Sequence, residues 1–205
     1  MIYVQTGIQE KSSHELQEAL RLLPDWRRAE VLRYKHLQGQ KECAYSYLLL
    51  CDAMRQEYGI TTQPHFLIGE HGKPTLQEFP HIHFNLSHCK VGVAVALSGA
   101  PVGIDIECVG RGNDSLMRHV LSQAEYELVH TAPEPSLEFT KYWTMKEAVV
   151  KLTGQGLGNN LKELLSLCDN MTIETHSNPA VGYVVSIARY RSADDGESIA
   201  LLRVI

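Results

Sequence analysis

The sequence predicts an α+β protein made of two halves of similar size, 1–99 and 100–205, each with helices packed on a small antiparallel sheet. In each half, helical patterns come first and a run of short β segments follows. A turn around Gly99 lies where the first run ends. Hydrophobic residues make up 44% of the 205 residues and charged residues 21%, which is the composition of a globular protein with a sizeable core.

Composition also narrows the possible functions. The net charge of −5 argues against nucleic-acid binding, which favours a basic excess, and no apolar run is long enough to span a membrane. The first ten residues, MIYVQTGIQE, lack the basic and long apolar regions of a signal peptide. Five cysteines without a C-x-x-C pair favour free thiols in a reducing compartment. We therefore expect a cytoplasmic protein that binds neither nucleic acid nor membrane.

Three helices are expected after an opening strand pattern at residues 1–8. Ser12 and Glu15 form a capping-box pattern at the start of the first helix. Gly39 punctuates the chain between the second and third helices. The apolar spacing places the three helices at about residues 15–23, 26–34 and 41–58.

Short β segments follow the third helix. A polar break at Ser87-His88-Cys89-Lys90 separates two of them, and Ser98-Gly99-Ala100-Pro101 turns the chain into the first strand of the second half. The expected strands cover residues 66–68, 81–86, 91–97 and 102–107.

The second half repeats the order of helices and then strands. Ser122 and Glu125 form another capping box, and Ser136 is the expected cap of a helix over 137–152 that ends at Gly154. A turn is expected at Asp194-Asp195-Gly196. The tail is expected to contain strands at 171–175, 181–189 and 198–204.

The segment VGIDIE at 102–107 carries two carboxylates, Asp105 and Glu107. Side chains alternate along a strand, so both acids project to one face while Ile104 and Ile106 face the other. Neighbouring carboxylates repel each other unless a cation lies between them, and oxygen-only ligands suit Mg²⁺ better than zinc. Taken alone, the pair fits an exposed edge strand better, so the metal interpretation depends on other residues that converge on it.

The segment WTMKEAVVK adds a third acid on a helix. Glu147 and Lys151 lie one turn apart, and by themselves they are an ordinary surface Glu–Lys pair. Beside the two strand acids, Glu147 is a candidate oxygen ligand and Lys151 a cation for a phosphate. Trp143 is expected to pack in the core.

The segments FNLSH and GKP carry groups that bind phosphate. Ser87 and His88 offer a hydroxyl and an imidazole at a strand end, and Lys73 is a charge positioned on a turn. The same segments also fit plain polar turns. A zinc site built from His81, His83, His88 and Cys89 is a further interpretation, which strand alternation disfavours.

GKPTL, FNLSH, VGIDIE and WTMKEAVVK occur in this order between Lys73 and Lys151. With these segments the chain resembles the 4′-phosphopantetheinyl transferases, and its length is similar to that of the two-halved, monomeric, surfactin-synthetase-activating type. The resemblance covers nearly the whole chain.

The resemblance implies two pseudo-symmetric α+β halves with the active site in the cleft between them. It implies that the phosphopantetheine group of coenzyme A moves to a serine of an apo acyl or peptidyl carrier protein, with release of adenosine 3′,5′-bisphosphate. The site residues implied by motif position are Asp105, Glu107 and Glu147 for Mg²⁺, Lys151 for the pyrophosphate, and Lys73, Ser87 and His88 for the phosphates of coenzyme A, with the 3′-phosphate at His88. Asp105 and Lys151 would also contact coenzyme A.

Three assignments are hypotheses beyond these motifs. Glu147, directly or through a water molecule, is the base for the serine proton. Basic residues of the first half are candidates for the adenine nucleotide, although they equally fit a solvated face. Because carrier proteins are acidic, a basic rim after the metal strand is a hypothetical docking surface. The nucleotide candidates are Arg27, Arg28, Arg33 and Lys41, and the rim comprises Arg111, Arg118 and His119.

Two other functions fit parts of the pattern. A metal-dependent hydrolase or nucleotidyl transferase of phosphate anhydrides would use the same acids and cations. A binding module for nucleotides or carrier proteins would carry the acids only as decoration of an edge strand. The presence of both the acids and the phosphate-binding cations favours the transferase.

Overall fold

The structure, a computed structural model, describes residues 1–69, 72–110, 112–154, 160–191 and 202–204. The helices are α1 Ser13–Leu22, α2 Asp25–Val31, α3 Leu37–Tyr58, α4 Asp114–Val120, α5 Gln123–Thr131 and α6 Pro135–Thr153, with 3₁₀ turns at Ile8–Glu10 and Leu165–Leu167. The strands are β1 Ile2–Thr6, β2 Phe66–Ile68, β3 Pro74–Leu76, β4 His83–Cys89, β5 Gly92–Ser98, β6 Val102–Cys108, β7 Met171–Asn178, β8 Tyr183–Tyr190 and β9 Leu202–Val204.

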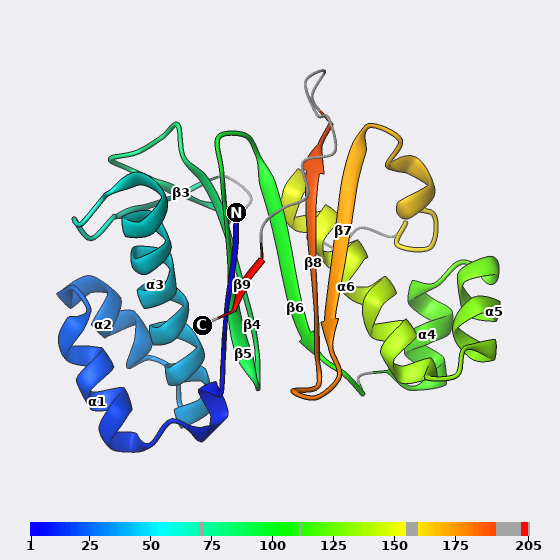
Figure 1. Cartoon of the computed structure of the whole chain (residues 1–205), viewed down its shortest axis with the longest axis horizontal. Helices are drawn as coiled ribbons and strands as arrows, with labels where there is room; N and C mark the ends of the chain where they lie inside the picture. The colour runs from blue at the N-terminus through cyan, green and yellow to red at the C-terminus, as the bar shows by residue number, and fades with distance from the viewer. Residues whose placement is uncertain (70–71, 111, 155–159, 192–201, 205) are drawn as a thin grey trace.

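These elements form four layers, which Figure 1 shows from left to right. Helices α1, α2 and α3 lie on one face of a first sheet, and a second sheet packs on its other face. Helix α6 covers the far face of the second sheet, with α4 and α5 outside it. The predicted α+β class is confirmed.

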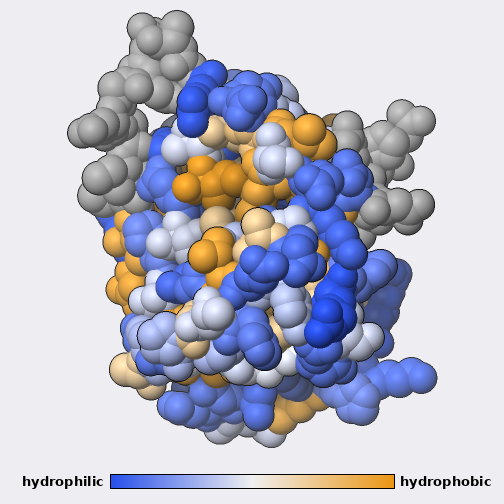
Figure 2. Space-filling view, turned by 90° about the vertical axis from the view of Figure 1, so that its right-hand side faces the viewer, coloured by the Kyte–Doolittle hydropathy of each residue, from blue (hydrophilic) through white to orange (hydrophobic). Residues whose placement is uncertain are grey.

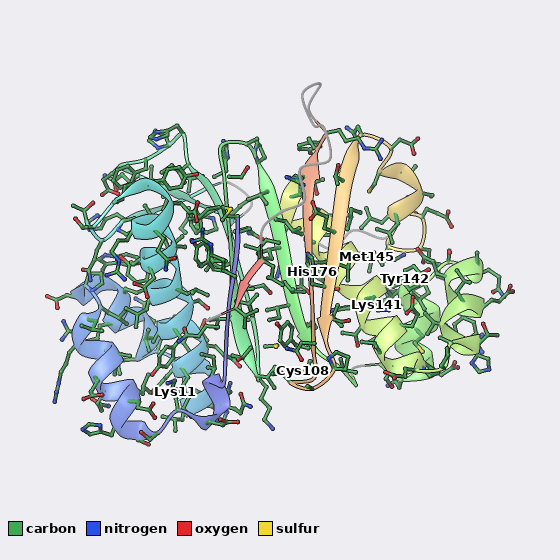
Figure 3. All side chains as sticks on the ribbon, viewed as in Figure 1. Lys11, Cys108, Lys141, Tyr142, Met145 and His176 are labelled. Carbon is green, nitrogen blue, oxygen red and sulfur yellow. The ribbon has the colours of Figure 1, made fainter. Side chains whose placement is uncertain are left out.

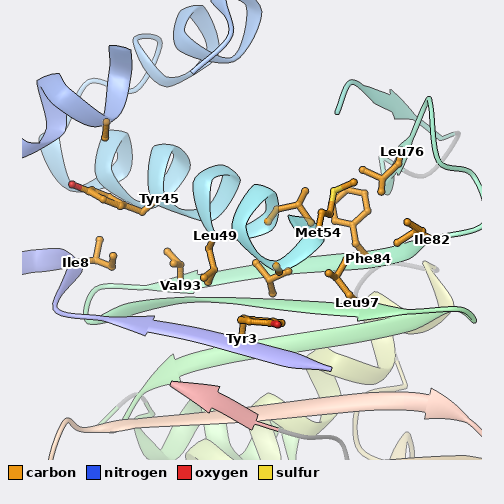
Figure 4. Close-up of a cluster of buried hydrophobic side chains, with 14 residues drawn as sticks. Tyr3, Ile8, Tyr45, Leu49, Met54, Leu76, Ile82, Phe84, Val93 and Leu97 are labelled. Atoms are coloured by element: carbon orange, nitrogen blue, oxygen red, sulfur yellow. The ribbon is translucent and has the colours of Figure 1, made fainter. Parts of the chain in front are cut away.

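The first sheet has the strand order β4-β5-β1-β9. β1 and β4 both pair antiparallel with β5, so Tyr3 lies opposite Val95 and Phe84 opposite Leu97. These residues point to α3 and bury the apolar side of that helix, as Figure 4 shows. The alternate positions of the sheet point to the other side, as a strand period of two requires.

The second sheet has the antiparallel order β6-β8-β7. Ile104 and Ile106 of β6 meet Ile2 and Val4 of β1 in a core between the two sheets. The opposite face of this sheet, which includes Ala188 of β8, packs against Ala148, Val149 and Leu152 of α6. The strand VGIDIE is therefore buried on one face by the first sheet and on the other by α6.

Two capping boxes hold the helix starts that the sequence predicts. The Ser12 hydroxyl accepts a hydrogen bond from the Glu15 amide (3.1 Å), while the Glu15 carboxylate accepts one from the Ser12 amide (2.7 Å). Ser122 and Glu125 make the same pair at the start of α5. Each box satisfies N–H groups that have no partner inside the helix.

Three local predictions are wrong. β4 continues through the expected break, because Ser87 and His88 pair with Ala94 and Val93 of β5. Helix α6 begins at Pro135, a residue suited to the first helical position, and Ser136 is not its cap. Gly39 lies inside α3, where the Tyr34 ring would stand 2.8 Å from any added Cβ.

The end of the chain returns to the first sheet. β9 pairs in parallel with β1, placing Leu202 opposite Ile2. Arg203 donates to the Tyr3 hydroxyl and to Gln56 Oε1, both at 3.1 Å. The last strand thus joins the N-terminal half, and the predicted turn at 194–196 lies outside the described residues.

The outer face on the C-terminal side is mainly hydrophilic, with separate apolar areas, as Figure 2 shows. Figure 3 labels Tyr142 on the side of α6 toward α4 and α5, where it packs with their apolar residues. Within the described part of the chain, no helix has both the length and the apolar content needed to cross a membrane.

Candidate active site

The two strand acids face α6, as the alternation along β6 predicts. Ile104 and Ile106 are fully buried on the side of the first sheet. Asp105 and Glu107 contact Lys151 and Trp143 of α6 on the opposite side.

Gly103 lets α6 approach β6 closely. A Cβ built on Gly103 would stand 2.9 Å from Leu152 Cα, and closer still to the Ala148 carbonyl oxygen and the Leu152 amide nitrogen. Backbone atoms of a helix cannot rotate away, so only glycine fits here. The close contact brings Lys151, on the last turn of α6, within reach of Asp105.

Asp105, Lys151 and Ser87 form a closed triangle. Lys151 Nζ donates to Asp105 Oδ1 (2.7 Å) and to Ser87 Oγ (2.9 Å), and the Ser87 hydroxyl donates to Asp105 Oδ1 (2.8 Å). The Asp105 side chain is only 5% exposed. Its second oxygen, Oδ2, is buried and has no hydrogen-bond partner among the described residues. A buried carboxylate oxygen without a partner is costly unless a cation or donor approaches it.

A polar cavity of about 290 Å³ opens beside this triangle. Trp143 Nε1 donates to Glu107 Oε1 (3.3 Å) at its wall, while the Trp143 ring packs against the buried cluster of Phe139, as the sequence predicts, so Trp143 joins the core to the site. The residues that line the cavity are Leu86, Ser87, His88, Asp105, Glu107, Trp143, Glu147 and Lys151.

The three predicted acids line one cavity but do not form a ready-made metal centre. Across the described residues, no three His, Cys, Asp or Glu side chains stand close enough together to hold one ion. The Lys151 ammonium already donates a hydrogen bond to Asp105 Oδ1, and Trp143 Nε1 donates one to Glu107 Oε1. The predicted convergence within bridging distance is therefore not found, and the same result counts against the zinc interpretation.

Side chains, and not a backbone ladder, join the two sheets beside the cavity. β4 and β6 are the facing edge strands, and they belong to separate sheets. Asn85 Oδ1 accepts a hydrogen bond from the Ile104 amide (2.8 Å), and Ser87 donates to Asp105. We call this joint the seam: Asn85 and Ser87 on β4, Ile104 and Asp105 on β6.

Lys73 closes the other end of the seam. Its Nζ donates to the carbonyl oxygens of Val102 (3.1 Å), Lys151 (2.7 Å) and Leu152 (3.2 Å). Burial lowers the pKa of the Lys73 ammonium. An ammonium has three donors, and all three are used here. Here the Lys73 charge binds the C-terminal end of α6, and its phosphate role stays a prediction.

A second cavity, of about 240 Å³, lies between Lys73 and the triangle. It shares Leu86 and Lys151 with the polar cavity, so Lys151 lies in the wall between the two. The remaining lining residues are Gly72, Lys73, Pro74, Asn85, Val150 and Gly154.

His88 points to α3 at the outer side of the polar cavity. Its Nδ1 lies 3.3 Å from Glu42 Oε2, and Gln38 Nε2 donates to Glu42 Oε1 (2.9 Å). Burial acts to raise the pKa of the Glu42 carboxyl, but the bonds from His88 and Gln38 outweigh it and keep that pKa below its usual range. Glu42 is thus a charged neighbour of His88 that sequence reasoning missed.

Most of the candidate nucleotide cations are used inside the first half. Arg27 is buried and donates to Glu30 (2.6 Å) and to the Cys43 carbonyl (3.1 Å). Lys41 is buried and donates to the Gln9 carbonyl (3.0 Å). Arg28 is paired with Asp25, and Arg33 is exposed.

The hypothetical docking rim is only partly described. Arg118 donates to Asp114 Oδ2 and to the Tyr126 hydroxyl, both at 2.8 Å, and its guanidinium lies 4.5 Å from the Tyr126 ring centre. His119 is exposed, and Arg111 lies outside the described residues.

Comparison with known proteins shows what the second half of the chain is similar to. A sequence model described as the 4′-phosphopantetheinyl transferase superfamily matches residues 101–193, which contain β6 and α6 with all three acids. Over these residues the chain is similar to the 4′-phosphopantetheinyl transferase superfamily.

Bacillus proteins are among the relatives of this chain. The "4′-phosphopantetheinyl transferase psf-1" of Bacillus pumilus is 32% identical over 138 residues, 66% of this chain and 59% of that protein. A "4′-phosphopantetheinyl transferase" of Bacillus subtilis is 30% identical over 134 residues, 64% of this chain and 60% of that protein. The "4′-phosphopantetheinyl transferase Sfp" of Bacillus subtilis is 25% identical over 173 residues, covering 83% and 74%. The match thus spans about three fifths of the first two relatives.

The donor set of the polar cavity fits a magnesium ion. It includes the carboxylates of Asp105, Glu107 and Glu147, and one oxygen, Oδ2 of Asp105, is buried and lacks a partner among the described residues. Hard divalent cations prefer oxygen ligands of this kind.

One lysine of WTMKEAVVK serves the fold. Lys146 is 1% exposed and donates to Glu125 Oε2 (2.7 Å) and the Leu161 carbonyl (2.7 Å), with the Val120 carbonyl at 3.2 Å. It therefore ties α6 to α4 and α5. Sequence reasoning missed it, because a lysine in a helix is most often exposed.

Proposed function

We propose that this protein transfers the 4′-phosphopantetheine group of coenzyme A to a serine of an apo acyl or peptidyl carrier protein, in a Mg²⁺-dependent reaction that releases adenosine 3′,5′-bisphosphate. The observation that carries the proposal is the state of Asp105. Its Oδ1 accepts hydrogen bonds from Lys151 and Ser87. Its Oδ2 is buried, lacks a partner among the described residues and lies beside the cavity that Glu107 and Glu147 also line. The names of the Bacillus relatives support the same activity.

In the proposed reaction the serine oxygen forms a bond to the phosphorus that carries pantetheine, and the anhydride bond to the nucleotide breaks. Such a transfer needs mainly positioning and charge stabilisation. Lys151 is the cation for the pyrophosphate oxygens, since it already lies between the two cavities. The Ser87 hydroxyl is a second donor, and His88 faces the nucleotide end of coenzyme A.

The acids have two roles in this proposal. Asp105, Glu107 and Glu147 would hold Mg²⁺, which when bound neutralises charge on the pyrophosphate. Glu147 lines the same cavity and accepts the proton of the attacking serine, directly or through a water molecule.

The seam supports a further part of the proposal, that the site lies between two related halves, 1–99 and 100–205, within one monomer. Ser87 comes from β4 of the first half and Asp105 from β6 of the second. The five cysteines are described and free, which fits a reducing cytoplasm.

The direct test is mass spectrometry of apo carrier proteins incubated with the protein and coenzyme A, with and without Mg²⁺. The expected result is a Mg²⁺-dependent gain of about 340 Da on one serine, the mass of the group that this phosphoryl transfer moves. Coenzyme A cleaved without a protein acceptor would point to an anhydride hydrolase. Coenzyme A bound but unchanged would point to a binding module.

A further inference from the structure

The Glu42 carboxylate lies beside His88, where the proposed function places the nucleotide end of coenzyme A, the donor of the transferred group. Glu42 is held by Gln38, and its side chain is 16% exposed, whereas that of His88 is 46% exposed. The Glu42–His88 pair carries a net charge of −1 when His88 is neutral and of zero when His88 is protonated. In neither state is it a net cation.

Two buried cations beside this part of α3 do not offset this charge. The donors of Arg27 are directed to Glu30 and Cys43, and Lys41 is buried against Gln9. A phosphate on the ribose would bring up to two further negative charges next to Glu42, and like charges at such range repel even when screened.

The pyrophosphate end is built differently. Lys151 and Ser87 offer donors there, and neither contacts Glu42 in the described structure. The groups that act on the reacting phosphorus are therefore separate from the pair that faces the far end of the nucleotide.

We propose, building on the proposed function, that this enzyme does not require the 3′-phosphate and accepts 3′-dephospho-coenzyme A about as well as coenzyme A. The same bonds form and break with either donor: the serine oxygen joins the pantetheine-bearing phosphorus and the anhydride bond breaks. The leaving group from the dephospho donor is adenosine 5′-monophosphate. Glu42 is the residue that sets this specificity.

The test compares kcat/KM for the two donors with one apo carrier protein at fixed Mg²⁺. The wild type is expected to use them within about threefold of each other. Glu42→Gln keeps the shape and removes the charge, so it should raise kcat/KM for coenzyme A by about three- to tenfold and leave the dephospho donor unchanged. Asp52→Asn is the matched control, because it removes the same charge from the same helix about 15 Å further along. It should change neither donor.

Circular dichroism at the assay temperature checks that each variant is folded. Replacing His88 by Ala gives an independent measure. If His88 does not bind the 3′-phosphate, the replacement should change kcat/KM for both donors by the same factor. A wild type that prefers coenzyme A by more than thirtyfold, with that ratio unchanged in Glu42→Gln, would overturn the proposal. Absence of transfer from both donors in every variant would instead reject the proposed function on which it is built.

Discussion

Replacing Gly103 by Ala tests whether the close packing of α6 on β6 positions the site. The added Cβ would start 2.9 Å from Leu152 Cα, and an ordinary contact begins at 3.4 Å, so the helix must retreat by at least 0.5 Å. The Ala148 carbonyl oxygen is nearer still and requires a larger shift. Overpacking of this kind costs about 1–3 kcal/mol, and we expect the upper end because the obstructing atoms are backbone.

The same retreat draws Lys151 away from Asp105, which it now meets at 2.7 Å. A misplacement of about 1 Å at a reacting centre costs roughly 100-fold in rate. We therefore expect Gly103→Ala to lose about 100-fold in kcat/KM for carrier-protein modification and about 3 kcal/mol in urea unfolding.

Gly99→Ala is the matched control, since no described atom beyond its chain neighbours lies within 4 Å of its added Cβ. It should keep wild-type activity and stability to within about 0.5 kcal/mol. If Gly103→Ala had both the activity and the unfolding midpoint of the wild type, the packing argument would be refuted.

Four further predictions concern single side chains. Glu147→Gln should nearly abolish transfer while leaving coenzyme A binding by calorimetry largely intact, and full activity would exclude Glu147 as base or metal ligand. Lys73→Met should lower the unfolding free energy by about 2–3 kcal/mol, because three carbonyls lose their donor, with little change in KM for coenzyme A. A selective rise in KM would instead support a phosphate role for Lys73. Lys146→Met should cost about 3–5 kcal/mol in thermal unfolding, since the Glu125 carboxylate loses its buried partner, and a loss below 1 kcal/mol would contradict that. The pKa of Glu42 is lower in the folded protein, so its contribution to stability is full above about pH 5 and is lost as the pH falls through the folded pKa. In urea unfolding between about pH 6 and 3, Glu42→Gln should therefore lose less stability than the wild type. Parallel stability curves for the two proteins would contradict the pairing of Glu42 with His88.

The sequence was sufficient where local rules decide the structure. Alternation along VGIDIE fixed the faces of Asp105 and Ile104, and the spacing of Glu147 and Lys151 placed both on one side of α6. The capping box at Ser12 rests on contacts within a single turn, so it too was predictable.

Contacts between distant segments could not be predicted in the same way. Lys73 was interpreted from its turn alone, whereas its carbonyl partners Lys151 and Leu152 lie 78 and 79 residues away. Likewise, the polar residues Ser87 and His88 suggested a break, but pairing with β5 keeps them in a strand, because sheet context overrides local preference. The neighbour of His88 is Glu42 on another element, and no spacing rule links the two.

The return of β9 to β1 has a consequence for how the chain can be divided. A fragment ending at residue 99 would lack both β9 beside β1 and β6 beside β4, leaving two open strand edges that invite pairing with other molecules. A fragment starting at residue 100 would carry β9 without its sheet. Produced apart, the two fragments should aggregate; produced together, they should recombine. Since Ser87 and Asp105 would then come from different polypeptides, transferase activity would report directly on complementation between the fragments.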